Sequence, residues 1–310
     1  MQINESKAVL VAGNGPSLTQ IDYNLLPQDI DVFRCNQFYL EEQYYVGKKI
    51  KAAFFHHGLF MEQQATMSIL LRNQEYECEH IVYSDLESQL SQPELTQDLL
   101  YWFPDTLNAF TLYREKLPEL AKYTQQLALF ENKILTSGAI MAVIAAAMGY
   151  QNIYIAGIDF YTGNQMYAFD NKKNNLLKLV PEFKQDTITP NWHDAETDLS
   201  VLKMLQTLYG IQIYTISPSS PLSTHFPLAP QTQYGKENRT KLAFAKAENA
   251  LKDIAIPNSY LYRYLRNKYF PATDKPALKN NLFYRFFHDL FHLPSDIRKY
   301  IRHKRKGKQS

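Results

Sequence analysis

Residues 8–18 read Ala-Val-Leu-Val-Ala-Gly-Asn-Gly-Pro-Ser-Leu, an apolar run that passes directly into a Gly-X-Gly turn. This order predicts a first β-strand that feeds a phosphate-binding loop, because glycines let backbone N–H groups approach an anion closely. Ser17 is predicted to cap the helix that follows, whose N-terminus favours negative charge. The third glycine of the dinucleotide fingerprint is absent, so NAD and FAD are not the expected ligands.

Outside this stretch, further short apolar runs alternate with helical patterns. The predicted strands are 8–12, 31–33, 51–55, 80–83, 153–156 and 211–216, and the clearest predicted helices are 59–71, 138–148 and 197–209. Alternation of this kind predicts an α/β fold with a Rossmann-like, mostly parallel sheet and helices on both faces. Ligands of such sheets lie at the carboxyl ends of the strands.

Two stretches break the alternation. Residues 160–193 mix Tyr, Asn, Lys and Pro without a clear period, which is typical of a functional lid inserted into a compact domain. From residue 260 onward, aromatic and basic residues interleave. We therefore expect a Rossmann-like domain formed by 1–159 and 194–259, a small lid at 160–193, and a C-terminal segment at 260–310.

The C-terminal segment carries most of the positive charge. Residues 296–310 hold seven Lys or Arg against one Asp, whereas the whole chain has a net charge of only +2. The rest of the chain is therefore net negative, which disfavours nucleic-acid binding. Ahead of the basic arm, apolar residues recur at spacings of three and four and form one helical face: Phe283, Phe286, Phe287, Leu290 and Phe291.

An apolar face followed by Lys and Arg is typical of an interfacial membrane helix. The alternative is a packed or oligomer-forming helix with a solvated tail. No signal peptide and no run of transmembrane length is recognisable, and the two cysteines, Cys35 and Cys78, have neither metal-site nor disulfide-scaffold spacing. These features favour a protein of a reducing cytoplasm.

Four further segments identify a family when they are taken with the opening loop. They are Asp-Val-Phe-Arg-Cys-Asn-Gln-Phe at 31–38, Thr-Ser-Gly at 136–138, Gly-Ile-Asp-Phe-Tyr at 157–161 and Tyr-Ala-Phe-Asp at 167–170. In this order they resemble the bacterial lipooligosaccharide sialyltransferases of glycosyltransferase family 42, from about residue 9 to residue 301. The resemblance implies transfer of N-acetylneuraminic acid from CMP-Neu5Ac to a terminal galactose, with inversion and an α2,3 linkage. It also implies a homotetramer and no cofactor, and with the tail it implies a cytoplasmic protein peripheral on the inner face of the cytoplasmic membrane.

Sugar transfer needs a base for the acceptor hydroxyl and stabilisation for the leaving phosphate. The resemblance assigns the first role to His193, whose imidazole titrates near neutrality, and the second to the phenol groups of Tyr161 and Tyr167. The chain has one Asp-X-Asp triplet, at 29–31. It precedes the second predicted strand, at the end away from the expected site, and is expected to be a turn or strand start. No metal is therefore expected.

The substrate-binding residues follow from the same motifs. The glycine loop and the asparagines after two strands are placed on the nucleotide and its phosphate, the start of the helix at 138 on the sialic acid carboxylate, and Asp159 on the ribose or cytosine. The predicted set is Gly13, Asn14, Gly15, Asn36, His56, Ser137, Gly138, Asp159 and Phe160.

Two positions depart from the family pattern. His56 stands where the family commonly has an asparagine, and Ile134 stands where it commonly has an arginine, with Lys133 one residue earlier. In the family that asparagine helps to hold donor or acceptor. The two departures leave the expected donor unchanged and leave the acceptor and the linkage open. The alternatives are therefore a sialyltransferase with α2,8 or bifunctional activity, another CMP-sugar transferase, or a non-catalytic CMP-sugar-binding membrane protein. The joint presence of Tyr161, Tyr167 and His193 disfavours the last.

Overall fold

The structure is a computed structural model of the 310-residue chain. It describes residues 8–84, 93–160, 166–170, 175–179, 193–247, 250–251, 253–270, 286–287, 289–295 and 297–298. The chain divides into two compact units, residues 1–257 and 258–310.

The first unit is built on a seven-stranded sheet with the strand order β6-β5-β4-β2-β1-β7-β8. Every neighbouring pair in this sheet is parallel. The strands are β1 (Ala8–Ala12), β2 (Asp31–Cys35), β4 (Lys49–Phe55), β5 (Glu77–Tyr83), β6 (Leu107–Asn108), β7 (Asn152–Ala156) and β8 (Gln212–Thr215). The predicted α/β fold is confirmed, with β2 at the centre of the sheet and β1 between β2 and β7.

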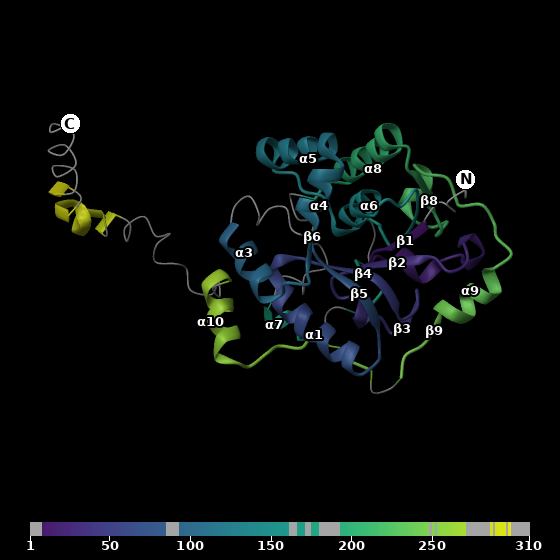
Figure 1. The fold of residues 1–310 in the computed structure, drawn as a ribbon, viewed down its shortest axis with the longest axis horizontal. Helices are drawn as coiled ribbons and strands as arrows, with labels where there is room; N and C mark the ends of the chain where they lie inside the picture. The colour runs from purple at the N-terminus through teal and green to yellow at the C-terminus, as the bar shows by residue number, and fades with distance from the viewer. Residues whose placement is uncertain are drawn as a thin grey trace. The chain divides into compact units, whose positions relative to one another are not determined.

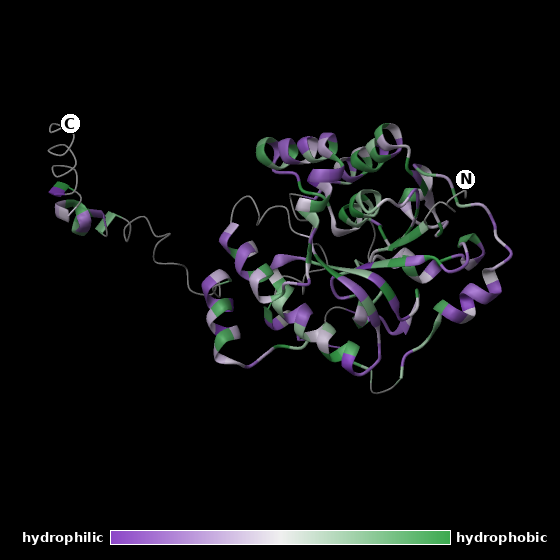
Figure 2. Ribbon diagram, viewed as in Figure 1, coloured by the Kyte–Doolittle hydropathy of each residue, from purple (hydrophilic) through white to green (hydrophobic). Residues whose placement is uncertain are grey.

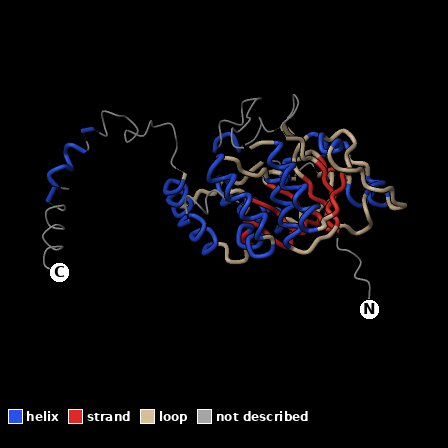
Figure 3. The backbone as a smooth tube through the Cα atoms, turned by 90° about the horizontal axis from the view of Figure 1, so that it is seen from above, coloured by secondary structure: helices blue, strands red, loops and turns tan. Residues whose placement is uncertain are grey.

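Helices cover both faces of the sheet (Figure 1, Figure 3). In Figure 1, α4, α5, α6 and α8 lie above the strands and α1 lies below them. Their bounds are α1 (Phe60–Arg72), α3 (Pro93–Trp102), α4 (Ala109–Lys116), α5 (Pro118–Glu131), α6 (Ser137–Ala147), α7 (Leu176–Leu179), α8 (Ala195–Tyr209) and α9 (Gly235–Leu242).

The core lies between the sheet and α6. Eight of the eleven residues of α6 are buried, and the helix packs on β1 and β2. Strands β1 and β7 are apolar over nearly their whole length, as is typical of parallel strands covered on both faces. Strands β4 and β5 begin with charged residues and end in apolar ones, and the sheet accordingly shows both green and purple in Figure 2. Gly149, with φ +89°, follows the C-cap of α6 in the left-handed conformation, which is a common way for a helix to end.

A second, two-stranded antiparallel sheet pairs β3 (Gln43–Tyr44) with β9 (Phe244–Ala245). Its pairing is reinforced by Lys246, whose ammonium lies 5.1 Å from the Tyr44 ring centroid and 5.7 Å from that of Tyr76. The Lys246 ammonium also donates to the carbonyl of Tyr39 at 2.7 Å. These contacts fasten the end of the first unit to the segment that follows β2.

The second unit begins with α10 (Tyr260–Tyr269), which Ser259 caps through a hydrogen bond from the Tyr262 amide. Further along, residues 286–287 and 289–295 are helical. Their large apolar side chains are exposed: Phe286, Phe287, Leu290, Phe291 and Leu293. Phe283 and the arm beyond residue 298 lie outside the described residues. Within the described part of the chain, no helix is long and apolar enough to cross a membrane.

Candidate active site

The glycine loop after β1 is shaped by the turn after β7. The amide of Gly13 donates to the carbonyl of Ala156 at 2.9 Å, and the amide of Gly15 donates to that of Gly157 at 2.8 Å. A Cβ on Gly13 would lie 2.2 Å from the Gly157 oxygen. The glycines are therefore required for contact with this turn. Their amides are bonded to carbonyl groups and are not left open as in a simple phosphate-binding loop, and contact of Gly13 and Gly15 with the donor stays a prediction.

Ser17 also differs from its prediction. The residues after the loop form a short 3-10 helix, η1 (Pro16–Gln20), whose N-cap is Gly15 and carries no side-chain cap. Instead, the Ser17 amide donates to Asp159 Oδ2 at 2.7 Å, and the Ser17 hydroxyl accepts from the Gly157 amide at 3.2 Å. One oxygen of Asp159 thus holds the loop, while its contact with the donor stays a prediction.

Asn14, between the two glycines, is fixed by a buried ion pair. Its Nδ2 donates to the carbonyl of Cys35 at 2.9 Å, and its Oδ1 accepts from an Arg34 Nη at 3.2 Å. The guanidinium of Arg34 is paired in turn with the carboxylate of Glu41, and both residues are about 1% exposed. We call residues 13–17 and 157–159, with Arg34 and Glu41, the loop frame.

The ends of β2 and the start of α6 meet at Asn36. This residue has φ +51°, and its Nδ2 donates to the Ser137 hydroxyl at 3.0 Å. Thr136 is the N-cap of α6 and accepts from the Ala139 amide. Among the described residues, no acceptor is bonded to the amides of Ser137 and Gly138. The helix start is therefore open to a carboxylate, and its contact with the sialic acid carboxylate stays a prediction.

His193 is oriented by a backbone carbonyl. Its Nδ1 lies 2.9 Å from the oxygen of Ile134, so Nδ1 carries the proton and donates, and Nε2 is the basic nitrogen. Burial lowers the pKa of His193; the bond to Ile134 raises it, and the nearby His56 ring adds to the lowering. The net lowering favours the neutral imidazole. His56, the predicted substrate contact after β4, is thus close enough to His193 to act on its pKa.

Two more contacts join the segment around Ile134 to the segment around His193. Lys133 Nζ lies 3.2 Å from Asp194 Oδ2 and 3.6 Å from Glu131 Oε2. The pairing with Asp194 raises the pKa of Lys133. Asp198 accepts from the Thr136 amide at 3.1 Å and from its hydroxyl at 2.5 Å. Burial raises the pKa of the Asp198 carboxyl to about 7. We call the contacts between 133–136 and 193–198 the histidine clamp.

Tyr167 is tied to the loop frame through its neighbour. The amide of Ala168 donates to the carbonyl of Asn14 at 2.8 Å, and the Tyr167 ring stacks on Phe169 with centroids 5.4 Å apart. Phe169 is buried and Tyr167 half-buried. Phe160, another predicted substrate contact, packs against the main core and has φ +52°. A bulky residue in this region is an unusual, strained feature of the kind found at functional sites. Tyr161 lies outside the described residues.

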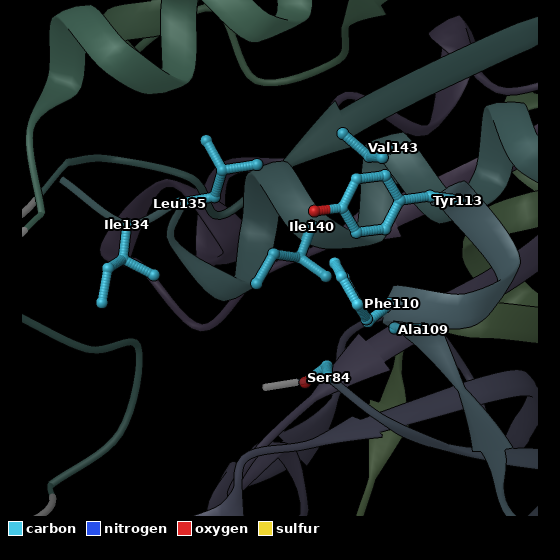
Figure 4. Close-up of a pocket in the computed structure, with 8 residues that line it drawn as sticks. All are labelled: Ser84, Ala109, Phe110, Tyr113, Ile134, Leu135, Ile140 and Val143. Atoms are coloured by element: carbon cyan, nitrogen blue, oxygen red, sulfur yellow. The ribbon is translucent and has the colours of Figure 1, made fainter. Parts of the chain in front are cut away.

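A small apolar cavity of about 20 Å³ lies behind the clamp, which is room for about one water molecule. Figure 4 shows the residues that line it, which come from the end of β5, from α4, from the 134–135 segment and from α6: Ser84, Ala109, Phe110, Tyr113, Ile134, Leu135, Ile140 and Val143. The Ser84 hydroxyl has no hydrogen-bond partner within the described residues. The cavity is too small and too apolar for a nucleotide, so the donor site is not here.

The Asp-X-Asp triplet is placed as expected, away from these residues. Asp29 has φ +55° in the turn before β2, and Asp31 starts β2 and accepts from the Tyr150 hydroxyl at 2.6 Å. In the described part of the chain, no group of three His, Cys, Asp or Glu side chains is arranged to hold a metal ion.

Sequence reasoning missed four residues of the site: Arg34, Glu41, Thr136 and Asp198. Arg34 had a readable signal, because a charged residue in the apolar run Val-Phe-Arg-Cys must find a partner when it is buried. Its partner Glu41 had no such signal in the sequence, because it lies seven positions later among residues without a periodic pattern.

Comparison with known proteins identifies the family. Residues 7–304 match the family described as Alpha-2,3-sialyltransferase (CST-I). An uncharacterized protein of Haemophilus influenzae is 37% identical over 235 residues, which are 74% of this chain and 95% of that protein. The crystal structure of the monofunctional alpha-2,3-sialyltransferase Cst-I from Campylobacter jejuni has a TM-score of 0.78 at 36% identity, covering 86% of this chain and 94% of that one.

The sialyltransferase CstII from Campylobacter jejuni is also similar. Its complex with the substrate analogue CMP-3FNeuAc has a TM-score of 0.75 at 40% identity, covering 84% of this chain and 98% of that chain. A CST-II complex with trisaccharide acceptor and CMP has a TM-score of 0.71 at 40% identity, with the same coverage. The chain belongs to the CST-I family of alpha-2,3-sialyltransferases and is a glycosyltransferase, as the motifs predicted.

Proposed function

We propose that this member of the CST-I family transfers N-acetylneuraminic acid from CMP-Neu5Ac to a terminal galactose of a lipooligosaccharide, with inversion and formation of an α2,3 linkage. The donor is supported by the relative CstII, which binds CMP-3FNeuAc. The glycan acceptor is supported by the CST-II complex with a trisaccharide acceptor. The linkage is supported by the family match.

The observation that carries the proposal is the bond between His193 Nδ1 and the Ile134 carbonyl. It leaves Nε2 to take the proton of the galactose hydroxyl as its oxygen attacks the anomeric carbon. The bond from that carbon to the phosphate oxygen breaks, and CMP leaves with the electron pair. The phenol O–H groups of Tyr161 and Tyr167 donate to the phosphate as its charge develops.

The segment 160–193 is proposed as the lid over this reaction, and the bond between the Ala168 amide and Asn14 is its contact with the loop frame. A closed lid keeps water from the oxocarbenium-like centre. Assembly into a homotetramer is a further proposal, which light scattering of the purified chain tests.

The test is CMP release from CMP-Neu5Ac with and without lactose, followed by linkage analysis of the product by NMR. We expect acceptor-dependent CMP release and an α2,3-linked product. Binding of CMP-Neu5Ac without turnover would support a non-catalytic binding protein instead, and an α2,8 product on a sialylated acceptor would support the bifunctional alternative.

We also propose that no metal or other cofactor takes part, because neutral phenol donors serve the leaving group. Excess EDTA in the same assay is expected to leave most of the activity. Loss of activity with EDTA and its return with Mg²⁺ or Mn²⁺ would contradict this.

The C-terminal segment is proposed to bind the inner face of the cytoplasmic membrane. The exposed helical side chains of Phe286, Phe287, Leu290 and Phe291 support this, and the following basic arm adds about 1 kcal/mol per residue near an anionic surface. A chain ending at Leu282 is expected to lose sedimentation with anionic vesicles and to keep activity on lactose, with its fold checked by circular dichroism. A full-length chain that does not sediment at low salt would favour a packed helix with a solvated tail.

A further inference from the structure

The Arg34–Glu41 pair is a fully buried ion pair. Both side chains are at most 2% exposed, and Arg34 stands on β2, between β1 and β4 in the centre of the sheet. Taking two ions out of water is costly, and apolar residues of similar size often replace such a pair without loss of stability. A role other than stability is therefore indicated for this pair.

The geometry shows what the pair does to its neighbour. Besides its bonds to Glu41, the Arg34 guanidinium donates to Asn14 Oδ1 at 3.2 Å, and its Cζ lies 5.2 Å from the Phe38 ring centroid. Arginine has no acceptor atom, so the oxygen of the Asn14 amide must face it. On the other side, the carbonyl oxygen of Cys35 can only accept a hydrogen bond, so the nitrogen of the Asn14 amide must face it. The amide of Asn14 has a single orientation as long as Arg34 is present.

The backbone of Asn14 carries this order to a second site residue. Its carbonyl accepts from the Ala168 amide at 2.8 Å, and Ala168 directly follows Tyr167. Asn14 thus connects the centre of the sheet and the glycine loop to the segment that contains Tyr167, whose phenol is predicted to donate a hydrogen bond to the phosphate.

We propose that the Arg34–Glu41 ion pair is a positioning device for the donor half of the active site: it orients Asn14 toward the nucleotide sugar and, through the Asn14 carbonyl, sets the place of Tyr167. Arg34 and Glu41 act as positioning residues and touch neither substrate. This inference rests on the proposed function, because it needs Asn14 at the donor.

The test replaces the pair by apolar residues of similar size, Arg34→Met with Glu41→Leu. The variant is expected to unfold near the wild-type temperature, to bind CMP about 10-fold more weakly in calorimetry, and to lose about 10–100-fold in kcat/KM for CMP-Neu5Ac, since a small misplacement of a site group costs up to about 100-fold. The matched control removes the surface pair of Lys51 and Glu79 by Lys51→Met with Glu79→Leu. Their charged atoms are 2.5 Å apart, on neighbouring strands of the same sheet, and the control is expected to behave as wild type.

A double-mutant cycle with Asn14→Ala separates positioning from a structural role. If Arg34 acts through Asn14, the pair replacement causes little further loss in the Asn14→Ala background, whereas independent effects multiply. Full activity of the folded double variant, a wild-type-like Asn14→Ala, or multiplying losses would each overturn the inference.

If the apolar replacement does not fold, Arg34→Lys takes its place in the same cycle. It keeps the charge beside Glu41 and loses the planar fork that reaches both Glu41 and Asn14, so the same interdependence with Asn14→Ala is expected. Absence of acceptor-dependent CMP release by the wild-type chain is a different result. It would contradict the proposed function and leave the CMP-binding measurement to judge the positioning role.

Discussion

The loop frame and the histidine clamp hold their residues by different forces. In the loop frame, backbone amides meet backbone carbonyls, and the only charges are the buried Arg34–Glu41 pair and the Asp159 carboxylate that accepts from Ser17. In the clamp, three side-chain contacts join residues 133–136 to residues 193–198, and four of the groups have shifted pKa values: Lys133, His193, Asp194 and Asp198. The comparison teaches that pH is expected to act on this enzyme through the histidine clamp, which holds the base.

The largest expected effect is at the centre of the clamp. His193→Ala is expected to lower kcat by about 10²–10⁴, the usual range for a general base, with donor affinity nearly unchanged. Steady-state kinetics and CMP calorimetry measure the two quantities. His225→Ala, at an exposed histidine in the turn after η7 (Pro221–Thr224), is the control. Near-normal turnover of His193→Ala would contradict the assignment of His193 as the general base and would leave no functional contrast between the two regions.

Next is Tyr167→Phe, which tests whether the loop frame supports chemistry as well as binding. The phenol O–H is lost and the ring remains to stack on Phe169, so we expect kcat to fall by about 10²–10³, as when one oxyanion donor is removed. Tyr214→Phe on β8, where the ring packs against Tyr154, is the matched control. A change confined to KM would show that Tyr167 only binds the donor.

A smaller effect, on stability, is expected from Gly13→Ala. The new methyl group would lie 2.2 Å from the Gly157 oxygen, and overpacking of this kind costs about 1–3 kcal/mol. Urea unfolding measures it. Gly58→Ala is the control, because its methyl group would meet nothing closer than His56 Nδ1 at 3.7 Å. Equal stability of the two variants would mean that the loop frame yields as easily as an open turn.

The smallest effect is a pH dependence of stability from the clamp. Asp198 has a pKa of about 7 in the fold, above its ordinary 3.8, so the folded chain binds the extra proton between these values. Its contribution to stability is complete below pH 4 and is lost as the pH rises through 7. Asp198→Asn cannot titrate and is expected to narrow the difference in unfolding free energy between pH 5 and pH 8.

The control is Asp105→Asn, at an exposed aspartate after α3. An Asp198→Asn chain with the wild-type pH dependence would show that the buried carboxyl does not titrate in this window.

The central strands could be predicted because each is a short apolar run next to a polar or glycine turn. The predicted strand 8–12 has the bounds of β1, and 31–33 and 51–55 fall inside β2 and β4. The pairings β5–β6 and β3–β9 could not be predicted, because each involves a two-residue strand that is too short to show an alternating pattern. The partners β3 and β9 also lie about 200 residues apart.

The site was predicted only as far as motifs and family resemblance reach. His193 was named, and the carbonyl that orients it was not, because the bond to Ile134 involves a backbone atom of a residue that looked like a plain departure from the family pattern. In the structure, the main-chain carbonyl of Ile134 orients His193, while the neighbouring Lys133 pairs with Asp194. Long-range side-chain pairs of this kind leave no period in a sequence.

The contacts that shape the glycine loop also have a place in time. The bond from Ser17 to Asp159 joins residues 142 positions apart, and closing so long a stretch of chain costs entropy that local contacts do not. Contacts of high sequence separation form late in folding. A nascent chain that ends before residue 157 therefore contains the glycine stretch without the turn that gives it its form, and the donor half of the site matures only when β7 has joined β1.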